Sequence, residues 1–133
     1  MRLNRWLAKT MLTASLASFC TTGLANNSEF ETFADQTGIA SYFNDKFHGQ
    51  RTASGEPYDK FDLTAAHATL PFGTLLHVVN LQNNQSVDVR VNSRAHRSNR
   101  RLLDLSKQAA KELGFLRSGI AKVKISVIRL GEA

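Results

Sequence analysis

Hydrophobic and polar residues alternate along much of the chain, which is the period of β-strands rather than of helices. In "SVDVRVN", residues 86–92, every second position is valine, and "AKVKISVIR", residues 121–129, repeats the pattern. Such alternation predicts strands with one buried face. Apolar runs at 38–43 and 74–81 predict two further strands. The predicted inward positions of the two alternating stretches are Val87, Val89, Val91, Val123, Ile125 and Val127.

A tight turn is predicted between two of these strands. Residues 82–85 read "QNNQ", and they separate the apolar run at 74–81 from the alternating stretch at 86–92. Asn83 and Asn84 are adjacent there, and asparagine tolerates the left-handed backbone that short hairpins require. We therefore expect a β-hairpin at this point.

The period changes once, at residues 106–114, "SKQAAKELG". Alanine and leucine at positions 109, 110 and 113 form one apolar face, which predicts a short helix. Asp104 or Ser106 can cap its start, and Gly114 is a suitable stop. The sum is a mainly β domain with one short helix. A closed barrel is favoured over an open sheet, because closure removes exposed strand edges.

The first 25 residues have the pattern of a secretory signal peptide. Basic residues precede position 10 without any acid, and the stretch "MLTASLASFCTTGLA" follows at 11–25. This run is short and interrupted by threonine and serine, which disfavours a permanent membrane anchor. We therefore predict export with cleavage after Ala25, a linker over residues 26–36 and one domain over residues 37–133.

Removal of the signal changes what composition implies. Cys20 is the only cysteine and lies in the signal; its lipidation is less favoured than its loss, because Phe19 precedes it where lipoprotein signals carry a small residue. The exported domain then depends on its own core rather than on disulfides. Three of the 17 basic residues leave with the signal, so the domain is less basic than the whole-chain net charge of +6. Mild basicity suits an anionic partner, and export argues against nucleic acid.

Six short motifs occur in order along residues 37–129: "FHG", "RTASGE", "LTAAH", "LPFGT", "VRVN" and "DLS". Together they make the chain resemble the rare lipoprotein A (RlpA-like) family. The resemblance implies a six-stranded double-psi β-barrel. It also implies a periplasmic or outer-membrane location and endolytic lytic transglycosylation of peptidoglycan glycan strands, preferably strands without stem peptides.

The resemblance further implies three functional residues: the glutamate of "SGE", the histidine of "AAH" and an aspartate after "VRVN". Glu56 and His67 match the first two, but Ser93 stands at the aspartate position, since the family's Asp-Arg-Gly-Pro is "SRAH" here. The reaction needs an acid to protonate the glycosidic oxygen and a base to take the proton from the sugar's own 6-hydroxyl; one carboxyl group can do both in turn. A serine hydroxyl cannot serve as this acid.

Three interpretations of this substitution remain open. Another carboxyl group, that of Glu56 or Asp104, takes over the proton transfer; related double-psi barrels place a functional aspartate in a stretch equivalent to "DLS". Alternatively, the domain binds glycan in the same groove without cutting it, or the loop has drifted and the protein is structural. Asp104 is at least equally well explained as a helix cap. Glu56 could also be a solvated loop acid after Gly55, but its match to the family motif favours a functional role.

Several neighbouring residues suit sugar binding. Tyr42 and Tyr58 are candidate stacking aromatics, whereas Phe43 and Phe47 are expected in the core. The resemblance places Arg90, Asn92 and Arg94 beside the site, where arginine binds hydroxyls, acetamido oxygens or a lactyl carboxylate. The remaining loop arginines, Arg97, Arg100 and Arg101, are expected to be solvated or to attract anionic wall or lipid head groups. The histidines lack the spacing of zinc ligands, so no metal or cofactor is predicted.

Overall fold

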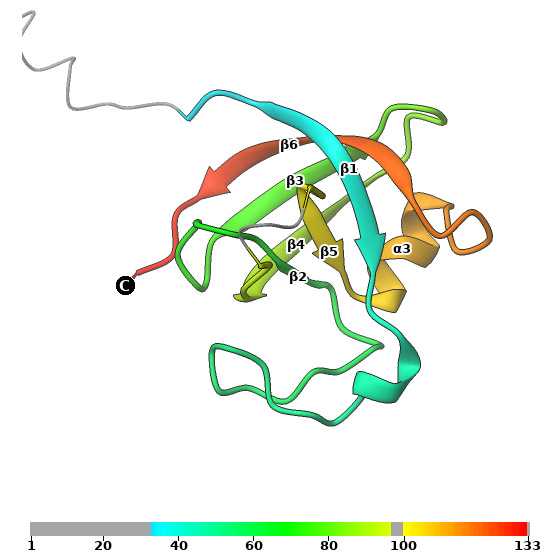
Figure 1. Cartoon of the computed structure of the whole chain (residues 1–133). Helices are drawn as coiled ribbons and strands as arrows, with labels where there is room; N and C mark the ends of the chain where they lie inside the picture. Colours follow the sequence, from blue (N-terminus) through cyan, green and yellow to red (C-terminus); the bar gives the residue numbers. More distant parts are fainter. Residues whose placement is uncertain (1–32, 97–99, 133) are drawn as a thin grey trace, which may run out of the picture. The chain divides into compact units, whose positions relative to one another are not determined.

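Strands of alternating sequence close into a barrel in residues 33–96 and 100–132, the parts of the chain that the computed structural model describes (Figure 1). The elements are β1 (Gln36–Tyr42), the 3-10 turn η1 (Asp45–Phe47), β2 (Thr64–Ala66), β3 (Leu75–Asn80), β4 (Ser86–Ser93), β5 (Leu103–Leu105), the α-helix α3 (Lys107–Leu113) and β6 (Ala121–Arg129). The predicted signal peptide with Cys20, the linker up to residue 32, and Arg97 lie outside the described residues. Within those residues, no helix is long and apolar enough to cross a bilayer.

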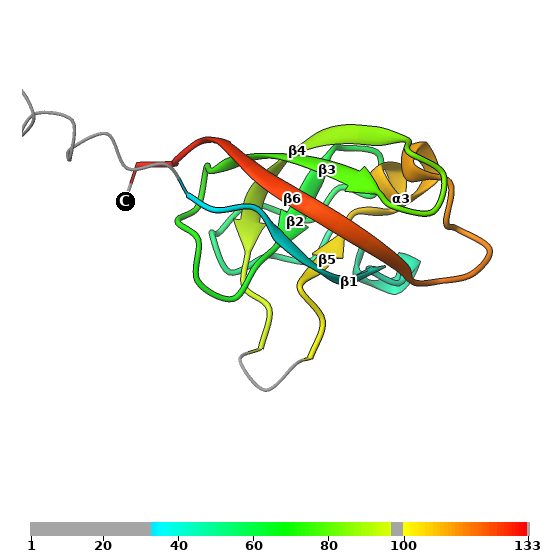
Figure 2. The same ribbon diagram turned by 90° about the horizontal axis from the view of Figure 1, so that it is seen from above.

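The barrel mixes parallel and antiparallel pairs around the closed order β1-β5-β2-β4-β3-β6. The β1–β5 and β2–β4 pairs are parallel, and the others are antiparallel. Seen from above, β6 crosses the barrel between β1 and β3 (Figure 2). The parallel pairs bring segments that are distant in sequence side by side, and this is how the functional motifs reach one face.

The barrel interior contains the valines that the alternation predicted to face inward. Val89 and Val91 of β4 are fully buried, as are Leu76 and Val78 of the adjacent β3 and Val123 of β6. Burying each such side chain contributes about 1.5–3 kcal/mol, so the interior is the main source of stability. The strands predicted at 38–43, 74–81, 86–92 and 121–129 are confirmed within a few residues.

The hairpin and the helix are also confirmed. Asn84 adopts φ 63° in the turn between β3 and β4. Ser106 caps α3, since its Oγ accepts a hydrogen bond from the amide of Ala109, and Gly114 ends the helix at φ 79°. Asp104 lies within β5 instead. The choice between the two possible caps therefore falls on Ser106, and the Asp104 carboxyl is not used as a cap.

The expectation that Phe43 and Phe47 both lie in the core is wrong for Phe47, which is 38% exposed. Phe47 ends η1 in the long excursion between β1 and β2, outside the barrel. Phe43 is half-buried and contacts the Phe47 and Tyr58 rings edge-on, with centroids 6.1 and 5.1 Å away. These two phenylalanines form a small aromatic surface beside the barrel rather than part of its interior.

Candidate active site

A β-bulge in β4 creates the centre of the site. Ala65 of β2 pairs with Val91, but the next residue, Ala66, pairs with Ser93, so Asn92 is an extra residue in the ladder. A bulge bends its strand and redirects side chains, and bulges are frequent next to active sites. Here the Asn92 side chain reaches Glu56, and Ser93 lines a surface pocket. The bulge therefore lets two consecutive residues contribute to one site: the buried Asn92 binds Glu56, and Ser93 forms part of the pocket wall.

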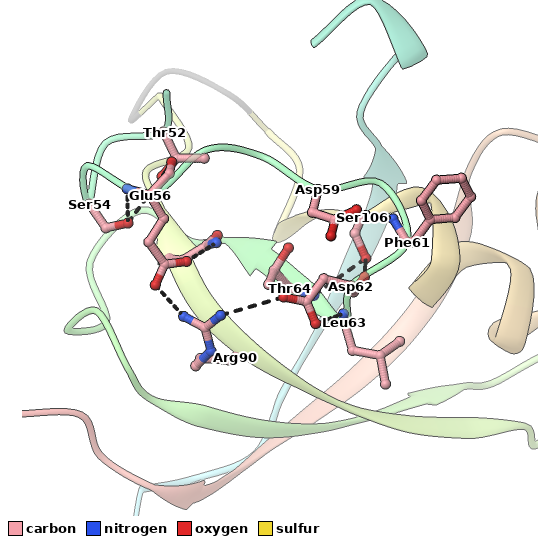
Figure 3. A network of polar contacts seen from close by, with 11 residues as sticks. Thr52, Ser54, Glu56, Asp59, Phe61, Asp62, Leu63, Thr64, Arg90 and Ser106 are labelled. Atoms are coloured by element: carbon pink, nitrogen blue, oxygen red, sulfur yellow. Dashed lines mark hydrogen bonds and ion pairs between the residues drawn. The ribbon is translucent and has the colours of Figure 1, made fainter. Parts of the chain in front are cut away.

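Glu56 is held over this bulge by a loop with its own internal hydrogen bonds. The amide of Thr52 donates to the carbonyl oxygen of Glu56 at 2.7 Å, and the glycine between them in the chain, Gly55, adopts φ 97°. The carboxylate of Glu56 accepts hydrogen bonds from Asn92 Nδ2 at 3.0 Å and Arg90 Nη1 at 2.8 Å (Figure 3). The loop thus fixes the carboxylate, whose side chain is 43% exposed, at the surface.

The charge state of Glu56 follows from these partners. The hydrogen bond from Asn92, then the hydrogen bond from Arg90, lower the pKa of the Glu56 carboxyl below its usual 4.5. Arg90 also lies 3.6 Å from a carboxylate oxygen of Asp62, so the guanidinium bridges two acids (Figure 3). Glu56 is therefore an oriented carboxylate at neutral pH, suited to accept a proton or to stabilise positive charge, and it is poorly suited to donate a proton.

His67 is buried at the end of β2, with 5% of its surface exposed. Its Nδ1 accepts hydrogen bonds from the amides of Thr69 and Leu70, both at 3.1 Å. Burial, and then the charge of Arg94, lower the pKa of the imidazole below 6.5. Because Nδ1 accepts, the neutral ring carries its proton on Nε2. His67 therefore orders the turn after β2 and has one N–H to offer.

Asp104 shares the outer face of the barrel with Ser93, on the other side of β2. Ala66 pairs with both residues, with Asp104 across the antiparallel β2–β5 ladder and with Ser93 across the parallel β2–β4 ladder. Since neighbouring strands lie about 4.8 Å apart, the Cα atoms of Asp104 and Ser93 are separated by roughly 10 Å. Asp104 Oδ1 accepts hydrogen bonds from Ser41 Oγ at 2.7 Å and Arg101 Nε at 2.9 Å, and its side chain is 14% exposed.

The two predicted sugar-stacking tyrosines are tied to the backbone. Tyr58 is 3% exposed, and its hydroxyl accepts a hydrogen bond from the amide of Lys107 at the start of α3. Tyr42 is half-buried, donates its hydroxyl proton to the carbonyl of Leu116, and packs edge-on against Phe115. Tyr58 also belongs to the lining of the pocket beside Ser93, whereas Tyr42 does not, and a sugar-stacking role for the two rings stays a prediction.

A pocket of about 230 Å³ adjoins the bulge. Ser93 forms part of its wall, and Phe43, Phe47, Arg51 and Thr52 line it as well. Sequence patterns did not indicate Arg51 as a binding residue, and they favoured the core for the two phenylalanines. The only signal for Arg51 was its position at the start of "RTASGE", the motif that ends in Glu56.

The predicted site residues are thus brought together to different degrees. Arg90, Asn92 and Glu56 are in direct contact, and Ser93 follows Asn92 in the chain. His67 is linked to Ser93 through its backbone, since its amide donates to the Ser93 carbonyl at 3.2 Å. Asp104 is farther away across β2. The Arg94 guanidinium lies 4.3 Å from the centre of the Phe72 ring and donates to the His67 carbonyl, so it supports the turn.

Comparison with known families identifies this arrangement. A sequence profile described as lytic transglycolase matches residues 35–125. The chain belongs to this family. Among its relatives, the endolytic peptidoglycan transglycosylase RlpA of Campylobacter jejuni is 49% identical over 96 residues, which cover 72% of this chain and 35% of that protein. The protein of the same name from Pseudomonas aeruginosa (strain UCBPP-PA14) is 50% identical over 91 residues, 68% of this chain and 27% of the relative. The chain therefore spans about a third of the length of the curated relatives it matches.

Solved structures show the same fold. The Streptomyces papain inhibitor aligns with a TM-score of 0.60 at 23% identity, covering 74% of this chain and 97% of that one. A Clavibacter michiganensis expansin mutant, solved in complex with cellohexaose, aligns with a TM-score of 0.58 at 19% identity, covering 75% of this chain and 53% of that one. The predicted six-stranded double-psi β-barrel with one short helix is confirmed as the fold.

Among residues 33–96 and 100–132, no group of three or more histidine, cysteine, aspartate or glutamate side chains is placed to hold a metal ion.

Proposed function

We propose that this domain is a lytic transglycosylase that cleaves peptidoglycan glycan strands, preferably those without stem peptides, and leaves 1,6-anhydro ends. Membership of the lytic transglycolase family and the names of its relatives support this proposal. The observation that carries it is the oriented carboxylate of Glu56, held at the surface by Arg90 and Asn92 beside Ser93.

In the proposed reaction an acid gives up one proton and a carboxylate, acting as base, takes up another. The acid donates a proton to the glycosidic oxygen, the bond from this oxygen to the anomeric carbon breaks, and the 6-hydroxyl oxygen attacks that carbon. The proton of the 6-hydroxyl passes to the base. The ionised, half-exposed Glu56 suits the base, and its negative charge also stabilises the positive charge that develops on the sugar ring. The N–H of His67 Nε2 is a candidate donor to a sugar oxygen.

Asp104 is the proposed proton donor in place of the family aspartate. Arg101 Nε and Ser41 Oγ both donate to its Oδ1, so this role requires that the substrate displaces the Arg101 contact and the carboxyl takes up a proton. Asp104 and Ser93 lie on one face and flank β2, so a sugar that contacts Ser93 lies over the same surface as the Asp104 carboxyl. The Ser93 hydroxyl then orients the substrate by hydrogen bonding. In this scheme, Arg90 and Asn92 are positioning residues that act through Glu56.

The lack of an obvious proton donor favours a second function, glycan binding without cleavage. Ser93 removes one carboxyl group from the site, and Glu56 is held ionised by Asn92 and Arg90. If Asp104 does not donate a proton, the domain retains a binding surface and lacks an acid. The two functions predict the same binding and different products.

The experiment that separates them incubates the purified domain with glycan strands stripped of stem peptides, followed by mass spectrometry for 1,6-anhydro ends. Cleavage is expected in the wild type and is expected to be lost in Asp104→Asn. Asp88→Asn, which changes an exposed carboxyl elsewhere on β4, is the matched control and should retain cleavage. Retained binding to sacculi without anhydro products would establish the binding function and reject the catalytic one. Cleavage by Asp104→Asn at the wild-type rate would reject our choice of proton donor.

We also propose that the domain works in the periplasm or at the outer membrane. The signal-like sequence of residues 1–25 supports export. N-terminal sequencing of protein recovered from the periplasm is expected to begin at Asn26. A chain that retains Met1, or that begins with a lipidated Cys20, would contradict cleavage after Ala25.

A further inference from the structure

The pocket beside Ser93 has a lining that is unusual for a site of acid-base chemistry. None of the described residues that line it carries a carboxyl group, and Arg51 is the only lysine or arginine among them. The other polar groups are neutral, including Gln50, Thr52 and Ser93. An arginine beside neutral hydrogen-bonding groups favours an anionic ligand, because no acid in the lining opposes a negative charge.

Ser93 makes the pocket more favourable to an anionic ligand, because it replaces an acidic residue. An aspartate at this position, which the family resemblance places there, would add a carboxylate to the pocket wall. That carboxylate would repel an anionic ligand and compete for Arg51. Glu56, only five residues from Arg51, does not neutralise it through any described contact, because the Glu56 carboxylate is bound by Arg90 and Asn92. The substitution that removes a catalytic acid therefore also makes this pocket more favourable to negative charge.

Arg51 is held in place for such a contact. The isolated bridge between Arg51 and Pro57 closes the loop, and Arg51 Nη1 donates to the carbonyl of Gly55 at 2.7 Å. A guanidinium group has five N–H donors in a planar fork, and this contact uses one of them. The geometry leaves donors for a carboxylate, which arginine binds through paired hydrogen bonds.

The size and the apolar side of the pocket limit the ligand. Its volume of about 230 Å³ is below the roughly 300–1,000 Å³ of sites for drug-sized molecules, so it takes one sugar ring or its substituents. Phe43 and Phe47 provide an aromatic surface for the apolar part of a ring. A single sugar that carries a carboxylate fits these demands, and in peptidoglycan glycan that sugar is N-acetylmuramic acid.

We propose that this pocket is a subsite for N-acetylmuramic acid with a free lactyl carboxylate, which Arg51 binds. This inference rests on the proposed action on peptidoglycan glycan, and it names the feature that selects the strand. A stem peptide is attached to the lactyl carboxyl through an amide, which removes the negative charge. The pocket therefore discriminates against strands that carry peptides, independently of whether the domain cuts them.

The test compares two tetrasaccharides of alternating N-acetylglucosamine and N-acetylmuramic acid, one with free lactyl carboxyls and one with these carboxyls amidated. Affinity is measured by NMR titration, and mass spectrometry afterwards records whether the ligand was cut. The wild type is expected to bind the free-carboxyl form about tenfold or more tightly than the amide, the scale of a hydrogen bond to a charged group. Arg51→Gln is expected to reduce this preference to within about twofold.

Two further variants separate charge at the pocket from other effects. Arg117→Gln removes an equal charge at an exposed position outside the pocket and should keep the full preference. Ser93→Asp leaves Arg51 in place and should reduce the preference by adding a carboxylate to the wall. Equal binding of the two tetrasaccharides by the wild type would overturn the subsite, even if the domain cuts both. A preference without any cleavage would support the subsite and contradict the catalytic proposal, and binding of neither form would overturn both.

Discussion

Glu56→Gln is expected to lower the cleavage rate strongly and the free energy of unfolding only slightly. The Glu56 and Arg90 side chains are 43% and 39% exposed, so solvent screens their ion pair. Exposed pairs of this kind contribute about 0.2–1 kcal/mol, and glutamine keeps one oxygen as a hydrogen-bond acceptor. Loss of a general base, in contrast, lowers a rate by about 100- to 10,000-fold. A tenfold change in rate corresponds to about 1.4 kcal/mol, so the catalytic effect exceeds the folding effect severalfold.

Both quantities can be measured on the same preparation. Urea unfolding followed by far-UV circular dichroism gives the free energy of unfolding, and the release of glycan fragments with 1,6-anhydro ends gives the rate. Glu112→Gln, a charge removal on the exposed side of α3, is the control and should change neither by much. The reasoning fails if Glu56→Gln cuts at the wild-type rate. It also fails if its rate falls only in proportion to a large loss of folded protein.

The remaining predictions concern the surroundings of this carboxylate. Ser93→Asp should raise the cleavage rate at saturating concentrations of stem-peptide-free strands, because it returns a carboxyl to the bulge, while it weakens the binding of their free lactyl carboxylates; a saturated rate no higher than wild type would argue against an acid at this position. Ser106→Ala should lower the free energy of unfolding by about 2–4 kcal/mol in urea titrations, since Ser106 Oγ accepts from the amides of Thr64 and Ala109 and donates to the Asp62 carbonyl. A loss below about 0.5 kcal/mol would contradict this hub role. The folded-state pKa of His67 is lowered, so its contribution to stability is full above pH 6.5 and is lost as pH falls below it. His67→Asn, which keeps an acceptor for the turn, should flatten this part of the stability-pH profile, and an unchanged profile would assign the effect to another group.

Most of the barrel could be predicted from sequence because its long strands bury one face. β4 and β6 alternate over eight and nine residues, and such a pattern is recognisable without tertiary information. The strands β2 and β5 were not predicted individually, although six strands were expected. Each is three residues long, so neither shows a period, and each exists because neighbouring strands pair with it on both sides.

The site was predicted in part, for a related reason. The motifs correctly placed Glu56 near Arg90 and Asn92, but no local pattern shows that Tyr58 is buried while Phe47 is exposed. Aromatic side chains have similar propensities in both situations, and their burial is decided by how the excursion between β1 and β2 folds over the barrel. Arg51 was missed for the same reason, since its role depends on a pocket formed by segments distant in sequence.

The extra residue in β4 makes chain length, and not only residue identity, a property of this site. Removing Asn92 would restore a regular ladder beside β2 with Ser93 still opposite Ala66, but it would remove both the bend in β4 and the side chain that binds the Glu56 carboxylate. A single-residue deletion would thereby dismantle a cluster that many individual substitutions would leave in place. Efforts to give this scaffold new carbohydrate preferences therefore have most freedom in the chemistry of the side chains at positions 51 and 93, and least in the number of residues between Val89 and Ser93.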